Sequence, residues 1–115
     1  MYAVKLTSDA VADFKALPKN VRNRLAKIMQ QELASNPHGV SSPLRPPLEG
    51  WRSFHYGAHR VVFTLLETER VVVIAAIGRH HTVASRDIYR RLEQAARAGR
   101  LAEALLRVLR ELPKR

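Results

Sequence analysis

The chain has 115 residues, of which 20 are Lys or Arg and 10 are Asp or Glu, so its formal net charge is +10. Hydrophobic residues make up 46% of the sequence, which argues against intrinsic disorder, and the lack of cysteine excludes disulfide and thiol chemistry. The length suits one domain, and neither a signal-peptide core nor a bilayer-spanning apolar run is present, so we expect a soluble cytoplasmic protein. The positive charge favours nucleic acid or an acidic protein as partner; the alternative is a solvated basic surface.

The N-terminal third of the sequence predicts one strand and two helices. Alternating apolar residues indicate a strand over residues 2–6. Apolar residues then recur at helical spacing over residues 10–17, after the N-cap chemistry of Thr7-Ser8-Asp9, and again over residues 19–34. Pro18 separates the two helices, and so short a joint predicts an antiparallel helical hairpin.

The middle of the sequence predicts a loop followed by three strands. Val40 to Gly50 contains three prolines and little periodicity, which indicates a surface loop, or else a mobile segment that becomes ordered on binding. Segments rich in β-branched and aromatic residues follow at Trp51–Tyr56, His59–Leu66 and Arg70–Ile77. The tight turns between them predict an antiparallel β-meander.

The C-terminal segment predicts two helices. A helical pattern opens at Ser85, is interrupted at Gly99, and continues as an amphipathic stripe to Leu112. We expect residues 1–96 to form one domain and residues 97–115 to be a helical extension of it, which docks on the sheet, covers a partner surface or pairs with another copy. The expected fold class is α+β, with the N-terminal strand and helical hairpin packed on the meander.

Basic residues lie on the predicted meander strands, next to apolar positions. Period-two alternation places Ser53 and His55 on one face of the first strand and Arg52 on the other. Arg60 stands at the head of an apolar strand, where an arginine is costly without a partner or a function. The third strand ends in the run from Arg79 to His81. Because neighbouring strands lie about 4.8 Å apart, these side chains can converge on one patch.

Such a patch suits the cleavage of RNA by internal transesterification. That reaction needs a base for the 2′-hydroxyl proton, charge stabilisation at phosphorus, and an acid for the leaving 5′-oxygen. Histidine supplies both kinds of proton transfer near neutral pH, arginine binds phosphate oxygens, and tyrosine stacks on a base or transfers a proton. The residues available for these roles are His55, His80, His81, Arg52, Arg60, Arg79, Tyr56 and Tyr89.

Other residues have simpler explanations. His38 and His59 lie in a loop and at a turn, where solvent exposure is expected, and Trp51 suits a core or edge anchor. Arg79 can also be a solvated strand end. His80 and His81 are adjacent and so point apart on a strand, and no cysteine or acidic group completes a ligand set, so we expect no metal.

Several short segments occur in a recognisable order along the chain. They are Tyr2–Thr7, Leu17-Pro18-Lys19 followed by Val21–Leu25, Leu48–Arg52, Gly57–Phe63, Ile77–His80 and Asp87-Ile88-Tyr89. In this order they resemble the RelE/ParE superfamily, the toxin halves of type II toxin–antitoxin modules. The resemblance extends from Tyr2 to about Leu92.

The resemblance implies a small α/β domain that either cleaves mRNA, usually on the ribosome, by metal-independent 2′-hydroxyl attack, or inhibits DNA gyrase. By position, Arg60 matches a phosphate-contacting arginine, His80 falls where a second arginine is common, and Tyr89 matches a tyrosine near the chain end. The candidate catalytic residues are therefore Arg60, His80, Tyr89 and His55. The candidate RNA or phosphate contacts are Arg52, Arg79, His81 and Lys19. No cofactor is expected.

The resemblance also implies a cognate antitoxin, expected to be acidic and partly disordered, with homo-oligomers or hetero-oligomers as further expectations. Four features depart from the family pattern. Ala58 and His59 replace an acidic and an aromatic residue, Arg79-His80 inverts the usual pair, and residues 82–85 resemble an insertion. A basic nucleic-acid-binding module without toxicity is therefore a third alternative to the ribonuclease and the gyrase inhibitor.

Overall fold

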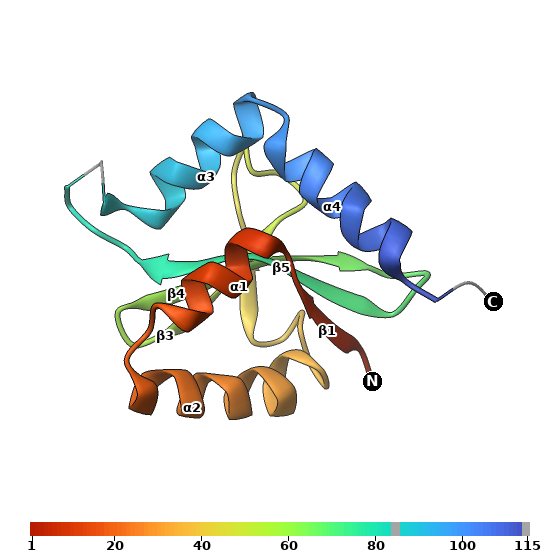
Figure 1. The fold of residues 1–115 in the computed structure, drawn as a ribbon, viewed down its shortest axis with the longest axis horizontal. Coiled ribbons are helices and arrows are strands. Elements are labelled where there is room, and N and C mark those ends of the chain that lie inside the picture. Colours follow the sequence, from red (N-terminus) through yellow and green to blue (C-terminus); the bar gives the residue numbers. More distant parts are fainter. Residues whose placement is uncertain (84–85, 114–115) are drawn as a thin grey trace.

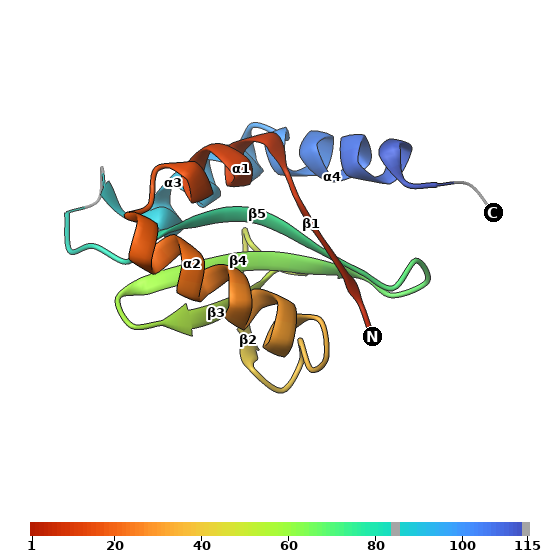
Figure 2. The same cartoon turned by 60° about the horizontal axis from the view of Figure 1, so that its bottom comes forward.

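The structure is a computed structural model that describes residues 1–83 and 86–113. Helices cover both faces of a five-stranded mixed sheet whose strand order is β1-β5-β4-β3-β2 (Figures 1 and 2). The predicted α+β class is confirmed. In chain order the elements are β1 (Ala3–Leu6), α1 (Ser8–Lys15), α2 (Lys19–Ile28), the π-helical turn η1 (Met29–Leu33), β2 (Ser41–Pro43), β3 (Arg52–Tyr56), β4 (His59–Leu66), β5 (Val71–Arg79), α3 (Ile88–Arg97) and α4 (Arg100–Glu111).

The predicted antiparallel meander is formed by β3, β4 and β5. β1 pairs in parallel with β5, from Ala3 opposite Val71 to Leu6 opposite Ile74. A shift in the pairing of β4 with β5 leaves Ala75 as the extra residue of a bulge. β5 therefore has a strand on both sides over its first half and lacks one on its outer side after Ile74.

α1 takes the place of a strand along the second half of β5 (Figure 1). The buried Thr7 hydroxyl accepts from the Ala10 N–H as the helix N-cap and donates to the Ala75 carbonyl, each at 3.2 Å. Further along, Asp13 Oδ2 accepts the Ile77 N–H at 2.9 Å. Side chains of the helix thus satisfy backbone groups at the outer edge of β5 that no strand pairs.

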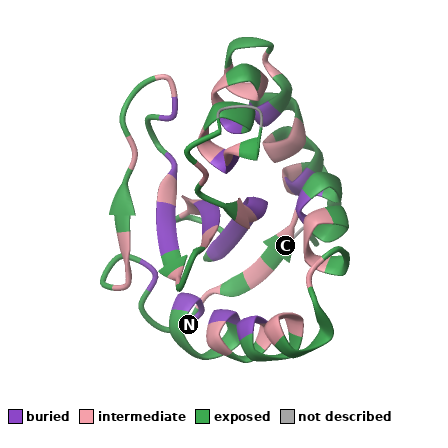
Figure 3. Cartoon of the chain, turned by 90° about the vertical axis from the view of Figure 1, so that its left-hand side faces the viewer, coloured by how far each residue is buried: buried purple, intermediate pink, exposed green. Residues whose placement is uncertain are grey.

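The core has two parts, one on each face of the sheet, and Figure 3 shows buried positions on the strands and on the inward sides of the helices. On one face α1, α2 and η1 cover Phe54, Val61, Phe63, Val72 and Ile74. On the other face α3 and α4 pack with Trp51 over Val62, Ala75, Ala76, Val71 and Val73. We call these the α2 face and the α3 face. Because both faces are covered, β4 and β5 are buried on both sides, which explains their continuous runs of β-branched residues.

Two predicted elements differ in extent from the structure. The segment Val40 to Gly50 was expected to be a loop, but it contains β2, which pairs antiparallel with β3. β2 is the outermost strand, so Pro43 can occupy it without breaking a ladder of hydrogen bonds. The helix predicted over residues 19–34 is regular only to Ile28 and closes with the wider turn η1.

The C-terminal helices follow the prediction closely. Ser85, the predicted start, lies outside the described residues; α3 begins at Ile88 with Asp87 as its N-cap. Gly99 adopts a φ of 76° and separates α3 from α4, as expected for a glycine in the left-handed region. α4 docks on the sheet, where Val108 packs with Val71 and other apolar residues of β5. Within residues 1–83 and 86–113, no helix is both long and apolar enough to cross a membrane.

Candidate functional site

Two strands, β3 and β4, place polar side chains on the α3 face, near the turn that joins them. Ser53 faces α3, because its Oγ lies 2.8 Å from the Tyr89 hydroxyl. His55, two residues further along β3, therefore points to the same face. On the neighbouring strand β4, Arg60 pairs with His55. On its other side, Arg60 pairs with Gly78 of β5. The absence of a side chain at Gly78 lets Ile88 of α3 pack closely over the sheet, since an added Cβ would lie 3.4–3.5 Å from the Ile88 side chain.

His80 and the start of α3 complete the group. The His80 ring meets the Tyr89 ring edge-on, with centroids 5.2 Å apart and an interplanar angle of 66°. His80 Nδ1 lies 2.6 Å from Asp87 Oδ1. We call His55, Arg60, His80, Asp87 and Tyr89 the candidate site. It unites all four residues that the sequence nominated as catalytic with one, Asp87, to which no role had been given.

Desolvation and two neighbouring positive charges favour the neutral form of the His55 ring. Burial lowers the pKa of His55 below its ordinary value, and the positive charges of Arg60 and His80 lower it further. Arg60 is the direct cross-strand partner of His55, so these two side chains are neighbours on the α3 face. A neutral imidazole beside an arginine can accept a proton while the arginine holds an anion.

The Arg60 guanidinium is held by the turn that precedes its strand. Its Nη1 donates to the Gly57 carbonyl at 2.9 Å and to the His59 carbonyl at 3.0 Å. Within residues 1–83 and 86–113, its Nε and Nη2 make no hydrogen bond. One side of the guanidinium is therefore fixed, and the other side can bind phosphate oxygens without first breaking a contact.

Asp87 is an ionised carboxylate at neutral pH. Burial of the side chain by itself raises its pKa, but the His81 N–H, the His80 ring and the Arg90 N–H all donate to it and together lower the pKa below its usual value. The carboxylate is only 11% exposed, whereas the His80 side chain is 56% exposed. A buried anion thus faces a histidine that solvent and ligands can reach.

The structure does not bring Arg52 into the candidate site. Arg52 alternates with Ser53 and points to the α2 face, where it donates to the Ser41 hydroxyl at 2.7 Å, the Ser41 carbonyl at 3.1 Å and the His38 carbonyl at 3.3 Å. It ties β2 and the preceding loop to β3. Lys19 begins α2, on the same α2 side of the sheet. Both residues therefore lie apart from the four that converge on the α3 face.

Arg79 and His81 lie at the margin of the candidate site. The His81 backbone N–H donates to Asp87 Oδ1 at 3.0 Å. Arg79 ends β5 and lines a cavity of about 480 Å³ between that strand and α3. Three more arginines line the same cavity, namely Arg86, Arg90 and Arg91, and Asp87 forms part of its wall. This arginine cavity thus adjoins the candidate site through Asp87.

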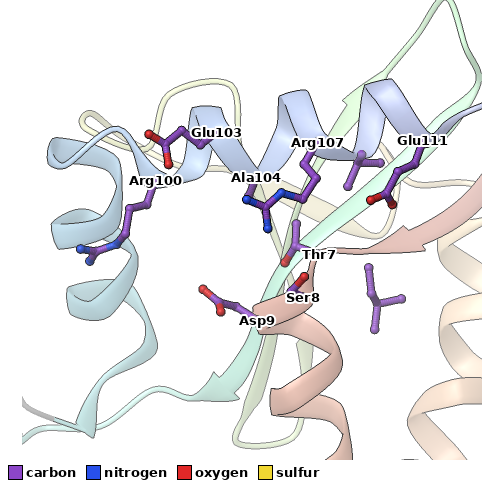
Figure 4. Close-up of a pocket in the computed structure, with 10 residues that line it drawn as sticks. Thr7, Ser8, Asp9, Arg100, Glu103, Ala104, Arg107 and Glu111 are labelled. Atoms are coloured by element: carbon purple, nitrogen blue, oxygen red, sulfur yellow. The ribbon is translucent and has the colours of Figure 1, made fainter.

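A second groove, of about 220 Å³, runs between α4 and the start of α1 (Figure 4). In the view of Figure 4, Arg107 reaches from α4 toward the start of α1, where Asp9 lies. Acidic and basic residues alternate along the groove, and no histidine lines it. The groove lacks the histidines of the candidate site, and its acidic side chains offset the charge of its arginines.

Asp87 is the member of the candidate site to which the sequence analysis gave no role. An aspartate just before a helical pattern indicates an N-cap, and this signal was available at Asp87-Ile88-Tyr89. Its contact with His80, seven positions earlier, depends on the path of the chain between β5 and α3. No three His, Asp or Glu side chains gather as a metal-binding group in the part of the chain that the structure describes.

Comparison with known proteins now assigns the family. Residues 4–84 match the family described as the ParE toxin of the type II toxin–antitoxin system parDE. The chain is 33% identical to toxin RelE of Mycobacterium tuberculosis over 78 residues, which cover 68% of this chain and 80% of that protein. The chain belongs to the RelE/ParE superfamily of type II toxins. A second relative, toxin RelG of the same organism, is 29% identical over 90 residues, covering 78% of the toxin described here and 98% of RelG.

Solved structures agree with this assignment. A chain of the Mycobacterium tuberculosis toxin–antitoxin complex RelBE2 superposes with a TM-score of 0.66 at 26% identity, covering 69% of the toxin and 98% of that chain. Isolated Escherichia coli RelE superposes with a TM-score of 0.58 at 18% identity, covering 74% and 93%, and shares the fold. The family match ends before α3, so Asp87, Tyr89 and all of α4 lie beyond the matched residues.

Proposed function

We propose that this toxin is a metal-independent endoribonuclease that inhibits translation by cutting mRNA on the ribosome. The observation that best supports the proposal is the convergence of His55, Arg60 and His80 on one face of the sheet. Two imidazoles and a guanidinium are the groups that 2′-hydroxyl transesterification requires. The relatives named RelE and RelG support a toxin of this type.

In the proposed reaction His55 is the general base. Its lowered pKa keeps the ring unprotonated at neutral pH, so it can take the proton of the 2′-hydroxyl. The 2′-oxygen then bonds to phosphorus while the bond from phosphorus to the 5′-oxygen breaks. The products are a 2′,3′-cyclic phosphate and a free 5′-hydroxyl.

His80 is the general acid of the same reaction. With Nδ1 bound to Asp87, its Nε2 is the nitrogen that faces away from the carboxylate and can protonate the leaving 5′-oxygen. Arg60 uses its unbound Nε and Nη2 to stabilise the charge on the phosphate oxygens. The Tyr89 hydroxyl is engaged by Ser53, so Tyr89 holds the His80 ring and offers its own ring for stacking on a base.

The surroundings of the candidate site support binding of a longer RNA strand. Arg79, Arg86 and Arg90 line the adjoining arginine cavity, and within residues 1–83 and 86–113 none of the three forms an ion pair. Phosphates that flank the scissile one can be bound there by screened attraction and counterion release. The net charge of +10 extends the attraction over the whole surface.

The proposed protein partner is an acidic, partly disordered antitoxin. Support comes from the relative that was solved as the complex RelBE2 and from the basic surface of this toxin. An acidic segment that folds on binding would be attracted by that surface and would cover charges that RNA also needs. Neutralisation and RNA binding would then exclude each other.

The test is mRNA cleavage in a translation extract, with cut sites mapped by primer extension. We expect His55→Ala and His80→Ala each to lower the rate about 10²- to 10⁴-fold, the usual contribution of acid–base groups. Arg60→Ala should lower it about 10²- to 10³-fold. His38→Ala and Arg24→Ala, at exposed positions outside the candidate site, are the matched controls. Full cleavage by the three site variants, with intact folding, would refute the assignment.

A gyrase inhibitor is the second candidate function, because the matching family description is that of a ParE toxin. It needs a binding surface and no catalytic set. A supercoiling assay beside the translation assay separates the two functions. Blocked translation with normal supercoiling selects the ribonuclease, and the opposite pattern selects the gyrase inhibitor.

A further inference from the structure

Asp87 makes more contacts than a helix cap requires. Its Oδ2 accepts the Arg90 N–H at 3.1 Å, which is the capping bond of α3. Its Oδ1 accepts the His81 N–H at 3.0 Å and lies 2.6 Å from His80 Nδ1. Serine or threonine would cap the helix as well but would have no second oxygen for the other two donors.

A carboxylate in this position dictates which His80 nitrogen carries the proton. An ionised carboxylate can only accept hydrogen bonds, so Nδ1 must be the donor. Neutral His80 is therefore the Nδ1–H tautomer, with its lone pair on Nε2, and protonated His80 presents Nε2–H to a ligand. The Tyr89 ring edge restrains the imidazole from a second direction.

We propose that Asp87 is a positioning residue that fixes the tautomer and the direction of the His80 ring for proton transfer to RNA. The proposal rests on the proposed ribonuclease function and adds to it a residue that acts through His80. Because one carboxylate serves both His80 and the N-cap, the ring can be in place only when the first turn of α3 is formed. Formation of the first turn of α3 and the orientation of His80 Nε2 therefore depend on each other.

Replacing Asp87 with asparagine separates capping from positioning. The side-chain oxygen of the asparagine can still cap α3, since asparagine is among the best N-cap residues. Its amide nitrogen would then take the place of Oδ1, so the His81 N–H would lose its acceptor, while His80 Nδ1 would become an acceptor and the proton would move to Nε2. We therefore expect Asp87→Asn to keep the fold and invert the tautomer. Asp87→Ser keeps the cap and leaves His80 without a partner.

The experiment measures tautomer and cleavage on the full chain. Nitrogen-15 NMR of the histidine rings should show His80 as Nδ1–H in the wild type and Nε2–H in Asp87→Asn. Cleavage should fall about 10²-fold or more in Asp87→Asn and Asp87→Ser, with the alkaline limb of the pH–rate profile displaced, because His80 must be protonated to act as the acid. In a His80→Ala background the same substitutions should cause no further loss, because both residues act through one group. Asp9→Asn, an exposed acidic residue in the first turn of α1, controls for loss of charge.

Each outcome decides the proposal. An unchanged His80 tautomer in Asp87→Asn, or wild-type cleavage with an unchanged pH profile in both variants, overturns it. An additional loss of cleavage in the His80→Ala background also overturns it, because Asp87 would then act independently of His80. If the wild-type chain cuts no RNA, the proposed function fails, while the NMR comparison still confirms or overturns the positioning of His80.

Discussion

Asp13 is expected to contribute more to the free energy of unfolding than its salt bridge with Arg91 alone would contribute. The two carboxylate oxygens bind the Arg91 guanidinium at 3.0 and 2.8 Å, and Oδ2 also accepts the Ile77 N–H at 2.9 Å. The Arg91 side chain is 52% exposed, so the ion pair contributes about 0.2–1 kcal/mol. Leaving the backbone N–H of a nearly buried strand without an acceptor costs about 1–3 kcal/mol. Asp13→Ala should therefore lower the free energy of unfolding by about 2–3 kcal/mol.

The backbone bond and the ion pair can be measured separately by urea and thermal unfolding. Arg91→Ala removes only the ion pair and should cost less than about 1 kcal/mol. At roughly 4 °C per kcal/mol for a domain of this size, Asp13→Ala should lower Tm by about 8–12 °C. Hydrogen exchange of the Ile77 amide should accelerate in Asp13→Ala and change little in Arg91→Ala. Equal losses of stability in the two variants would refute the importance of the edge bond.

Three further substitutions test the fold and its pH dependence. Thr7→Val removes a buried cap and a bond to β5 and should cost about 1–2 kcal/mol by urea unfolding, whereas Thr64→Val, at a more exposed hydroxyl, should cost less than about 1 kcal/mol. Phe63→Ala empties the centre of the α2-face core and should cost about 3–5 kcal/mol, leaving a weakly cooperative transition; a Tm within a few degrees of wild type would contradict the packing. His55 has a lowered pKa in the folded state, so the unfolded chain takes up its proton first as pH falls through about 6.5, and the fold loses stability toward pH 5. In His55→Gln, Tm should change less between pH 7 and pH 5 than in the wild type. If Tm depends on pH as steeply in the variant, another group causes the loss of stability.

Local patterns in the sequence predicted most of the fold. The β-branched runs marked β4 and β5, and Gly99 marked the break between α3 and α4. β2 was missed because Ser41 to Pro43 has neither alternation nor β propensity, and it is a strand only because β3 lies beside it. The parallel pairing of β1 with β5 joins distant segments, which no local pattern encodes.

Candidate site residues were predicted best where strand periodicity applied. Alternation placed His55 with Ser53 and apart from Arg52, and the structure has them so. The same alternation argued against grouping Arg52 with His55, although both had been named as candidates. The sequence analysis gave Asp87 no role because its proposed role depends on a contact with His80 that forms only in three dimensions. A carboxylate near the start of a helix is also explained well enough as an N-cap.

The parallel pairing of β1 with β5 limits the order in which a newly synthesised chain can fold. Until residues 71–79 have emerged from the ribosome, β1 and α1 have no sheet to rest on, and α3 emerges later still. Asp87 and Tyr89 therefore join the candidate site only after all five strands have emerged. Until then the candidate site residues on β3 and β4 are separated from those on α3, and the surface that we propose to be toxic is incomplete.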